Sequence, residues 1–376
     1  MANIIFASYF FRYPLGGMVS WALQYLLGIR AGGHDVCLVE RADYCDAFYC
    51  PDRRVLTDDP QTGLRRLTPV LEKYDLKKWR LVDRFGHAYG MSDLQFEEFF
   101  RSADLLIDGG NHGAWLPFIK DGQKTILIDG EPGYTQIRWV TGQSIALDFD
   151  MYFSNGMLLG TPASRAPTAG KLWRHVFNPV MPGFFAAQPP CGGSAWTTIM
   201  NWQSHKVVEY AGKIYGQKDV EFEKLFDLPA RTRVPLSVGI SGKAPHERMK
   251  NCGWLIEDAQ QITQTVADYK NHIYRSRGEF SVCKNVFVAL RTGWFSDRSA
   301  AFLASGRPVI LQDTGFSEVL PTGEGLFGFR CTEDALASID AVESDYVRHS
   351  LKAREIAQEY LAADKIMAGL IDTALG

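Results

Sequence analysis

The sequence predicts an α/β protein with two domains, each built on a mostly parallel sheet. The chain has 376 residues, which exceeds the roughly 250–300 residues at which a single hydrophobic core stops growing. Short apolar runs that end in glycine or polar residues alternate with segments of helical period in both halves. A stretch rich in proline and glycine, 157–195, separates these halves. We therefore expect a cleft between two domains, which is the usual place for a ligand site.

The N-terminal half begins with a predicted βαβ unit. A strand is expected at 3–9, and a helix follows the pair Gly16 and Gly17, because apolar residues then repeat at helical spacing. A second strand is expected at 34–40. This order implies parallel strands joined by a right-handed crossover.

The alternation continues along the chain. Further helices are predicted at 92–103 and from about Tyr134, and further strands at 104–110, 125–131 and 150–156. In the second half the same reasoning predicts strands at 234–241, 254–258, 285–293, 308–313 and 325–330, with helices at 246–253 and 259–274 and an amphipathic helix at 219–228. We assign one domain to 1–185, a second to 190–355, and a C-terminal helix that packs back on the first domain to 356–376.

Composition narrows the functional classes. The chain is 46% hydrophobic and 22% charged with a net charge of −3, so no global basic field attracts nucleic acid or an anionic membrane. The seven cysteines form no CxxC pair, which indicates reduced thiols and no metal site. No basic leader and no run of 18 apolar residues occurs, so we expect a cytoplasmic protein without a signal peptide or transmembrane segment.

Two turns in the second half are predicted to bind phosphate. They are 292–296 and 313–317, and each follows a predicted strand and precedes a predicted helix. Helix N-termini carry unsatisfied N–H donors in a positive field, which suits an anion. Ser296 is a good helix N-cap, and Arg298 in the first turn would add a charged donor. The first hypothesis is therefore a nucleoside-diphosphate site.

These features resemble the GT-B superfamily of glycosyltransferases, whose fold has two Rossmann-like domains facing each other across a cleft. The glycine pair that opens the first helix, with AGGHDVCLVE (31–40) behind it, is similar to the first βαβ unit of that fold. FLASGRPVILQDTGFSEVL (302–320) is similar to the donor-binding segment of the GT4-like branch. The resemblance covers about fifty residues closely and implies that the second domain holds the donor and the first the acceptor.

The resemblance implies a metal-independent hexosyltransferase that uses no cofactor. It would move a sugar from a UDP- or dTDP-sugar to a small-molecule or glycan acceptor, with no nucleic acid as partner. One departure concerns two glutamates of GT4-like enzymes, because Gly293 and Ala301 stand at their places. Glu279, Asp297 or Glu318 are the alternatives for such a carboxylate.

The donor candidates lie at loops and helix starts of both domains. We assign donor nucleotide or phosphate binding to Gly16, Gly17, Ser241, Gly242, Lys243, Trp294, Ser296, Arg298, Thr314, Gly315, Phe316 and Glu318. Lys218 precedes a helix and could reach the cleft, but a solvated lysine at the start of the helix is the preferred interpretation.

The acceptor side offers three catalytic candidates at the ends of successive predicted strands. His112 is preferred as the base because the pKa of an imidazole lies near neutrality. Asp129 and Glu131 are the alternatives. Two other functions stay open: a nucleotide-sugar epimerase or hydrolase with the same donor site, and a non-catalytic nucleotide-sugar-binding protein.

Overall fold

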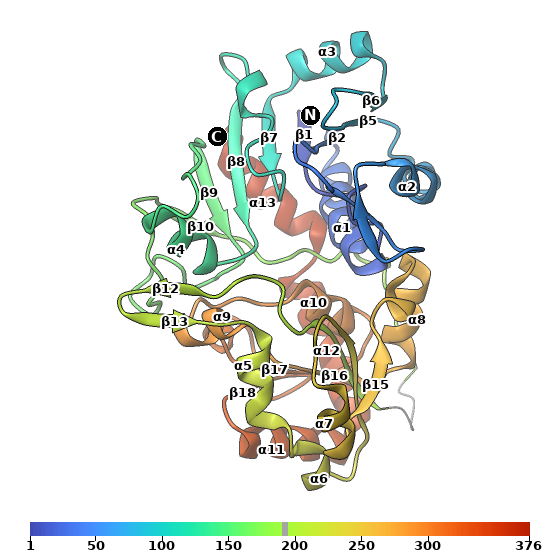
Figure 1. Cartoon of the computed structure of the whole chain (residues 1–376), viewed down its shortest axis with the longest axis vertical. Helices are drawn as coiled ribbons and strands as arrows, with labels where there is room; N and C mark the ends of the chain where they lie inside the picture. The colour runs from blue at the N-terminus through green and yellow to red at the C-terminus, as the bar shows by residue number, and fades with distance from the viewer. Residues whose placement is uncertain (190–194) are drawn as a thin grey trace.

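The computed structural model describes residues 1–189 and 195–376 and shows two α/β domains, one above the other (Figure 1). Residue 190, where the second domain was predicted to begin, lies outside the described residues. No described helix is both long and apolar enough to cross a bilayer.

The N-terminal domain is built on an eight-stranded sheet with the order β10-β9-β8-β7-β1-β2-β5-β6. All its neighbouring strands pair in parallel except β5 and β6, which form a hairpin. The strands are β1 (Asn3–Ala7), β2 (Asp35–Arg41), β5 (Trp79–Val82), β6 (Ala88–Gly90), β7 (Leu105–Asp108), β8 (Lys124–Asp129), β9 (Met151–Ser154) and β10 (Trp173–His175). The helices are α1 (Gly16–Ala31), α2 (Gln61–Lys73), α3 (Asp93–Ser102), η1 (Leu116–Phe118) and α4 (Tyr134–Val140). A small antiparallel hairpin is formed by β3 (Phe48–Cys50) and β4 (Val55–Thr57).

The C-terminal domain is built on a parallel six-stranded sheet with the order β15-β14-β11-β16-β17-β18. Numbered within the domain this is 3-2-1-4-5-6, the strand order of dinucleotide-binding domains. The strands are β11 (Trp196–Asn201), β14 (Leu236–Ser241), β15 (Leu255–Asp258), β16 (Gly278–Ser281), β17 (Val309–Gln312) and β18 (Leu326–Phe329). The helices are α5 (Lys218–Phe222), η2 (Glu223–Leu225), α6 (Leu228–Arg231), α7 (His246–Asn251), η3 (Gln261–Thr263), α8 (Val266–Arg275), α9 (Asn285–Leu290), α10 (Asp297–Ala304), η4 (Phe316–Glu318), α11 (Thr332–Ser344), α12 (Tyr346–Tyr360) and α13 (Ala363–Leu375). A second hairpin, β12 (Val208–Tyr210) with β13 (Lys213–Tyr215), projects toward α4.

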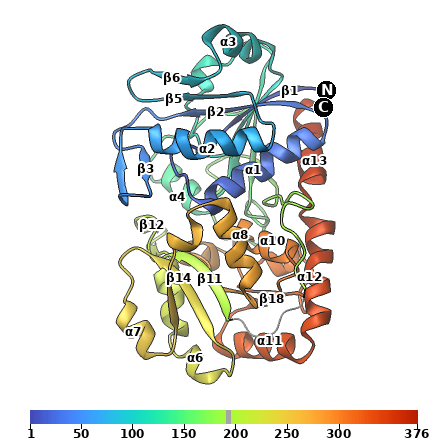
Figure 2. The same ribbon diagram turned by 90° about the vertical axis from the view of Figure 1, so that its right-hand side faces the viewer.

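The C-terminal helices connect the two domains (Figure 2). α12 packs against α10 in the second domain, whereas α13 packs against α1 in the first. The chain thus crosses between domains a second time, beside the first crossing: the Val180 N–H donates to the Leu361 carbonyl at 2.7 Å, and the Ala363 N–H donates to the Val180 carbonyl at 3.0 Å. The predicted fold of two Rossmann-like domains with a returning C-terminal helix is confirmed.

Three predicted elements differ, and one of them, the helix predicted at 259–274, is divided into η3 and α8. The strand predicted at 285–293 is wrong, because this segment forms α9 and ends at Arg291 in a left-handed conformation. The run NVFVAL buries Val286, Phe287 and Leu290 at helical spacing, and a short apolar run carries too little periodicity to separate strand from helix. The helix predicted at 219–228 is broken into α5, η2 and the start of α6.

Candidate functional site

The two sheets present their carboxyl ends to each other, and each has a topological switch point there. In the first sheet, β1 and β7 are neighbours, but the chain continues from β1 to β2 on one side and from β7 to β8 on the other. In the second sheet, the chain continues in the same way from β11 to β14 on one side and from β16 to β17 on the other. Ligands of open parallel sheets bind at such points. The loops after these four strands therefore form the walls of the candidate site.

The loop after β7 holds His112 in a fixed and strained position. One Asp108 carboxylate accepts the backbone N–H groups of Gly110 at 3.0 Å, Asn111 at 2.7 Å, His112 at 3.2 Å and Gly113 at 2.6 Å. His112 itself has a φ of +53°, which is costly for a residue with a Cβ and occurs at functional sites. The residue is exposed.

Desolvation within the cleft lowers the pKa of His112, and the positive charges of Arg12 and Arg138 act in the same direction against the opposing charge of Asp108. The imidazole is therefore neutral at neutral pH and able to accept a proton. This geometry agrees with a base, although the catalytic role itself stays a prediction.

Asp129, at the end of β8, is buried and fully occupied by hydrogen bonds. Its carboxylate accepts from the Thr135 hydroxyl at 2.7 Å, the Gln136 amide at 2.8 Å and the Glu131 N–H at 3.0 Å. Burial raises its pKa, against the effect of these donors. The contacts fix the turn into α4, so the structure places Asp129 where it orients Glu131.

Glu131 reaches across the domain boundary. Lys284, which precedes α9 in the second domain, donates to both carboxylate oxygens at 2.5 and 2.6 Å. His205, from the loop after β11, lies 3.8 Å from the same carboxylate and stacks on Tyr134. Burial acts to raise the pKa of Glu131, but the charge of Lys284 and the contact with His205 outweigh it and hold the pKa at about 2. In this arrangement Glu131 is a permanent anion rather than a base.

Lys218 is a buried cation at the switch point of the second sheet. Only 8% of the residue is accessible, which corrects the expectation of a solvated lysine. Its ammonium makes no hydrogen bond or ion pair within residues 1–189 and 195–376. Burial, together with the nearby charges of Arg298 and Lys284, lowers its pKa to about 7. Lys218 is largely buried and its ammonium has no hydrogen-bond or ion-pair partner in the described residues, whereas the neighbouring Arg298 and Lys284 are paired with Glu279 and Glu131. The free ammonium is therefore the candidate contact for an anionic ligand.

Arg298 was predicted to bind phosphate, but its side chain is hydrogen-bonded to residues of β11 and β16 in the second sheet. Its guanidinium donates to Glu279 at 2.5 Å, to the Ile199 carbonyl at 2.6 Å and to the Ser281 hydroxyl at 2.7 Å. Ser296 occupies the N-cap position of α10, but its hydroxyl makes no cap hydrogen bond. Arg298 therefore acts on the site through its charge, with the buried Glu279 as its counterion.

The two predicted phosphate turns lie at the junction of the domains. The Gly293 N–H donates to the Thr314 carbonyl at 2.8 Å, so one turn binds the other, and the Leu158 N–H donates to the Thr292 carbonyl at 2.9 Å from the first domain. A Cβ on Gly315 would lie 2.5 Å from a methyl carbon of Leu158. These backbone groups thus bind protein, and their phosphate role stays a prediction.

The other donor candidates are spread more widely. Trp294 packs on Phe287, Phe316 is buried in the core, and Glu318 pairs with Arg291. Ser241, the last residue of β14, and the following Gly242 and Lys243 are exposed. No hydrogen bond or ion pair in the described residues joins these three residues to Lys218.

Gly16, at the start of α1, allows close approach of the domains. A Cβ on Gly16 would lie 2.1 Å from the Thr265 carbonyl oxygen just before α8, whereas one on Gly17 would meet Tyr269 at an ordinary 3.7 Å. Only the first glycine is therefore required by packing.

Three residues of the site were missed or undervalued in the sequence. Lys284 follows β16 of the second sheet, and Lys218 follows the hairpin strand β13. A single lysine beside a loop forms no periodic pattern, so nothing in the sequence marks either residue as part of a site. His205 belongs to the loop after β11, a strand that was not predicted. Among the described residues, no three His, Cys, Asp or Glu side chains converge at metal-binding spacing.

No family model and no curated protein matches the sequence. Solved structures match nearly the whole chain at low identity. An α-glucosyltransferase in complex with UDP is 13% identical with a TM-score of 0.60 and 99% coverage of both chains. The α-glucosyltransferase in complex with UDP and a 13-mer DNA is 12% identical, with a TM-score of 0.58 and 99% coverage of both chains. Sucrose-phosphate synthase from Thermosynechococcus elongatus is 12% identical with a TM-score of 0.53, over 99% of this chain and 98% of that chain.

These similarities concern the fold. They agree with the resemblance found in the sequence. The DNA complex also means that the low net charge gives no basis for excluding nucleic acid as a partner.

Proposed function

We propose that this chain, which has the GT-B fold, is a glycosyltransferase that moves a sugar from a nucleoside diphosphate to a hydroxyl group of an acceptor. Lys218 is the observation that carries this proposal. It is a buried ammonium without a partner in the described residues, and it lies where a Rossmann-like domain binds nucleotides. A diphosphate would supply the missing negative charge.

In the proposed reaction, the bond between the anomeric carbon and the diphosphate oxygen breaks while a bond to the acceptor oxygen forms. The nucleoside diphosphate leaves with the bonding electrons. Lys218 stabilises the charge that develops on it. This cation supports a reaction that needs no metal ion.

Deprotonation of the acceptor hydroxyl is assigned to His112. The imidazole is neutral at neutral pH, and the residue is exposed and held by the Asp108-capped loop of the opposite domain. Glu131 is assigned a positioning role, because its pairing with Lys284 connects the acceptor wall to the donor wall.

UDP is the preferred nucleotide and a hexose the preferred sugar, supported by the UDP complex of a fold relative. The acceptor panel should contain small molecules and glycans, and also DNA because one relative binds it. The alternatives of a hydrolase or epimerase predict free sugar or an altered donor without acceptor, and a binding protein predicts no turnover at all.

The test compares Lys218→Ala with Lys213→Ala, an exposed lysine on β13. Binding of UDP and UDP-glucose is measured by isothermal titration calorimetry. We expect at least a tenfold loss of affinity for Lys218→Ala, because a charge-assisted contact contributes about 1.5–3 kcal/mol. Lys213→Ala should bind like the wild type. Equal affinity in all three proteins, or no binding to the wild type, would refute the proposal.

A further inference from the structure

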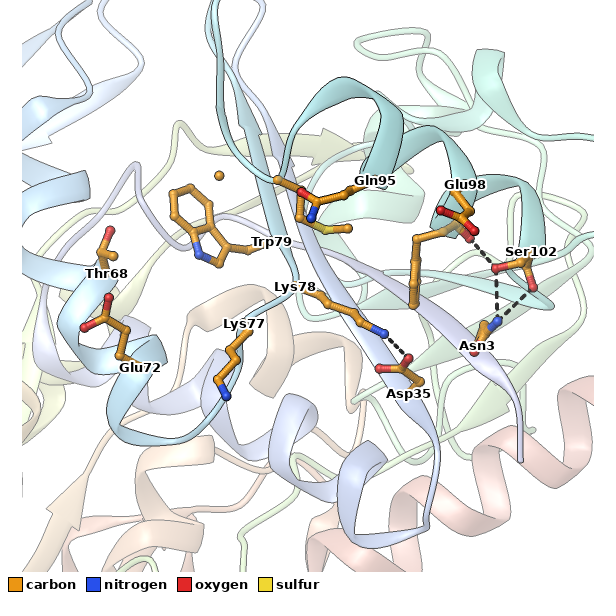
Figure 3. Close-up of a pocket in the computed structure, with 13 residues that line it drawn as sticks. Asn3, Asp35, Thr68, Glu72, Lys77, Lys78, Trp79, Gln95, Glu98 and Ser102 are labelled. Atoms are coloured by element: carbon orange, nitrogen blue, oxygen red, sulfur yellow. Dashed lines mark hydrogen bonds and ion pairs between the residues drawn. The ribbon is translucent and has the colours of Figure 1, made fainter.

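A cavity, drawn in Figure 3, lies on the N-terminal domain at the amino-terminal ends of β1, β2 and β5, away from the candidate site. Its volume is about 680 Å³, within the range of about 300–1,000 Å³ that small-molecule sites occupy. It opens between α2 and α3, and Asn3, Asp35 and Trp79, the first residues of β1, β2 and β5, line it. Since the cleft receives the carboxyl ends of these strands, the cavity is a separate feature.

Trp79 gives the cavity an aromatic surface. The indole packs against Phe11 with ring centroids 4.9 Å apart, and it stays partly accessible. Gly90 on the neighbouring strand keeps the ring clear, since a Cβ there would lie 2.6 Å from the indole Cε3. The indole N–H has no hydrogen-bond partner in the described residues. The ring thus offers both an apolar face and a free donor.

The polar groups around Trp79 are a mixture of free donors and acceptors. The Thr68 hydroxyl, the Gln95 amide N–H₂ and the carboxylates of Glu72 and Glu98 line the cavity. None of these groups has a side-chain hydrogen-bond or ion-pair partner within the described residues. Sugar hydroxyls both donate and accept hydrogen bonds. This mixture of groups therefore suits a sugar better than a ligand that can only donate or only accept.

The charges of the cavity argue against an anionic ligand. Three acidic residues, Asp35, Glu72 and Glu98, line it against two lysines. Both lysines are already paired, Lys78 with Asp35 and Lys77 with Asp75. A phosphate would meet free carboxylates and no free cation, whereas a neutral polyol would not be repelled.

We propose that this cavity binds a neutral saccharide. The C–H face of a pyranose ring lies on Trp79, and its hydroxyls bond to the indole N–H and to Glu72, Gln95 and Glu98. The site lies apart from the nucleotide cleft, and its occupation does not depend on the reaction proposed there.

The test uses ¹⁹F NMR of protein labelled with 5-fluorotryptophan. The nine tryptophans give separate signals, and the signal missing from Trp79→Phe identifies Trp79. Maltose and cellobiose are titrated with and without UDP. Because UDP is expected to occupy the cleft between the domains, the comparison separates sugar binding in that cleft from sugar binding in the cavity at Trp79. We expect the Trp79 signal to move to saturation with a dissociation constant of about 1 mM, with UDP present or absent.

Two neighbouring exposed acids on α3 provide the matched variants. Glu98 lines this cavity and Glu97 does not. We expect Glu98→Ala to weaken the titration about fivefold, as the loss of one hydrogen bond would, and Glu97→Ala to leave it unchanged. No movement of the Trp79 signal up to roughly 50 mM of either sugar, far above the expected constant, would overturn the proposal. Equal titrations in Glu98→Ala and the wild type, or movement of cleft tryptophans only, would overturn it as well.

Discussion

The environment of Lys218 in the fold could not be predicted from the residues next to it in the sequence. A lysine next to a helix start is normally solvated, because its ammonium is costly to bury. Here the residue is largely buried at the start of α5. The sequence does indicate His112 and Glu131, because both follow predicted strands. It does not indicate Lys218 or Lys284, since their meaning depends on which strands become neighbours.

The pKa of Lys218 leads to a prediction about pH. It is about 7 in the free protein, and a bound diphosphate favours the charged form and raises it. Above pH 7, binding of UDP-glucose must therefore take up a proton, and affinity should fall by up to tenfold per pH unit. Calorimetry in two buffers of different ionisation enthalpy measures this uptake. Lys218→Met should abolish it, and an uptake that persists in this variant would point to another group.

At the scale of elements, the sequence predicted most strands of the two sheets but not β5, β6, β10, β11 and β16. Strands such as 104–110 are apolar and end in glycine, so they are visible locally. β11 was missed because it follows a proline-rich segment and contains the polar residues Thr197 and Thr198. Their hydroxyls bond to distant residues, Ser276 at the end of α8 and Ser281 of β16. α9 was mistaken for a strand because a run of five apolar residues, 286–290, fits both periods.

The contact of α1 with the segment before α8 predicts unequal effects of two adjacent glycines. Gly16→Ala places a Cβ within 2.1 Å of the Thr265 carbonyl, so the domains must move apart, at a cost of about 1–3 kcal/mol for overpacking. Gly17→Ala has room and should be neutral or slightly stabilising, because alanine favours a helix. Urea unfolding measures both, and equal midpoints would contradict the close approach.

For the whole molecule, α13 belongs in sequence to the end of the chain and in space to the first domain. Met367 is fully buried there, against Gly28 of α1. We expect Met367→Ala to destabilise the protein by about 2–5 kcal/mol and to reduce amide protection in α1 rather than in β16 or β17. Hydrogen exchange measures this, with the exposed Leu351→Ala as control. Protection lost first in the second domain would contradict the assignment.

This placement of α13 also has a consequence for synthesis on the ribosome. A growing chain usually folds its N-terminal domain first. Here the face of α1 that packs against Met367 of α13 stays uncovered until the second domain has been synthesised. The first domain is thus completed only after the second has been made. While the second domain is being made, the nascent chain exposes this face of α1, which is the kind of surface that chaperones bind.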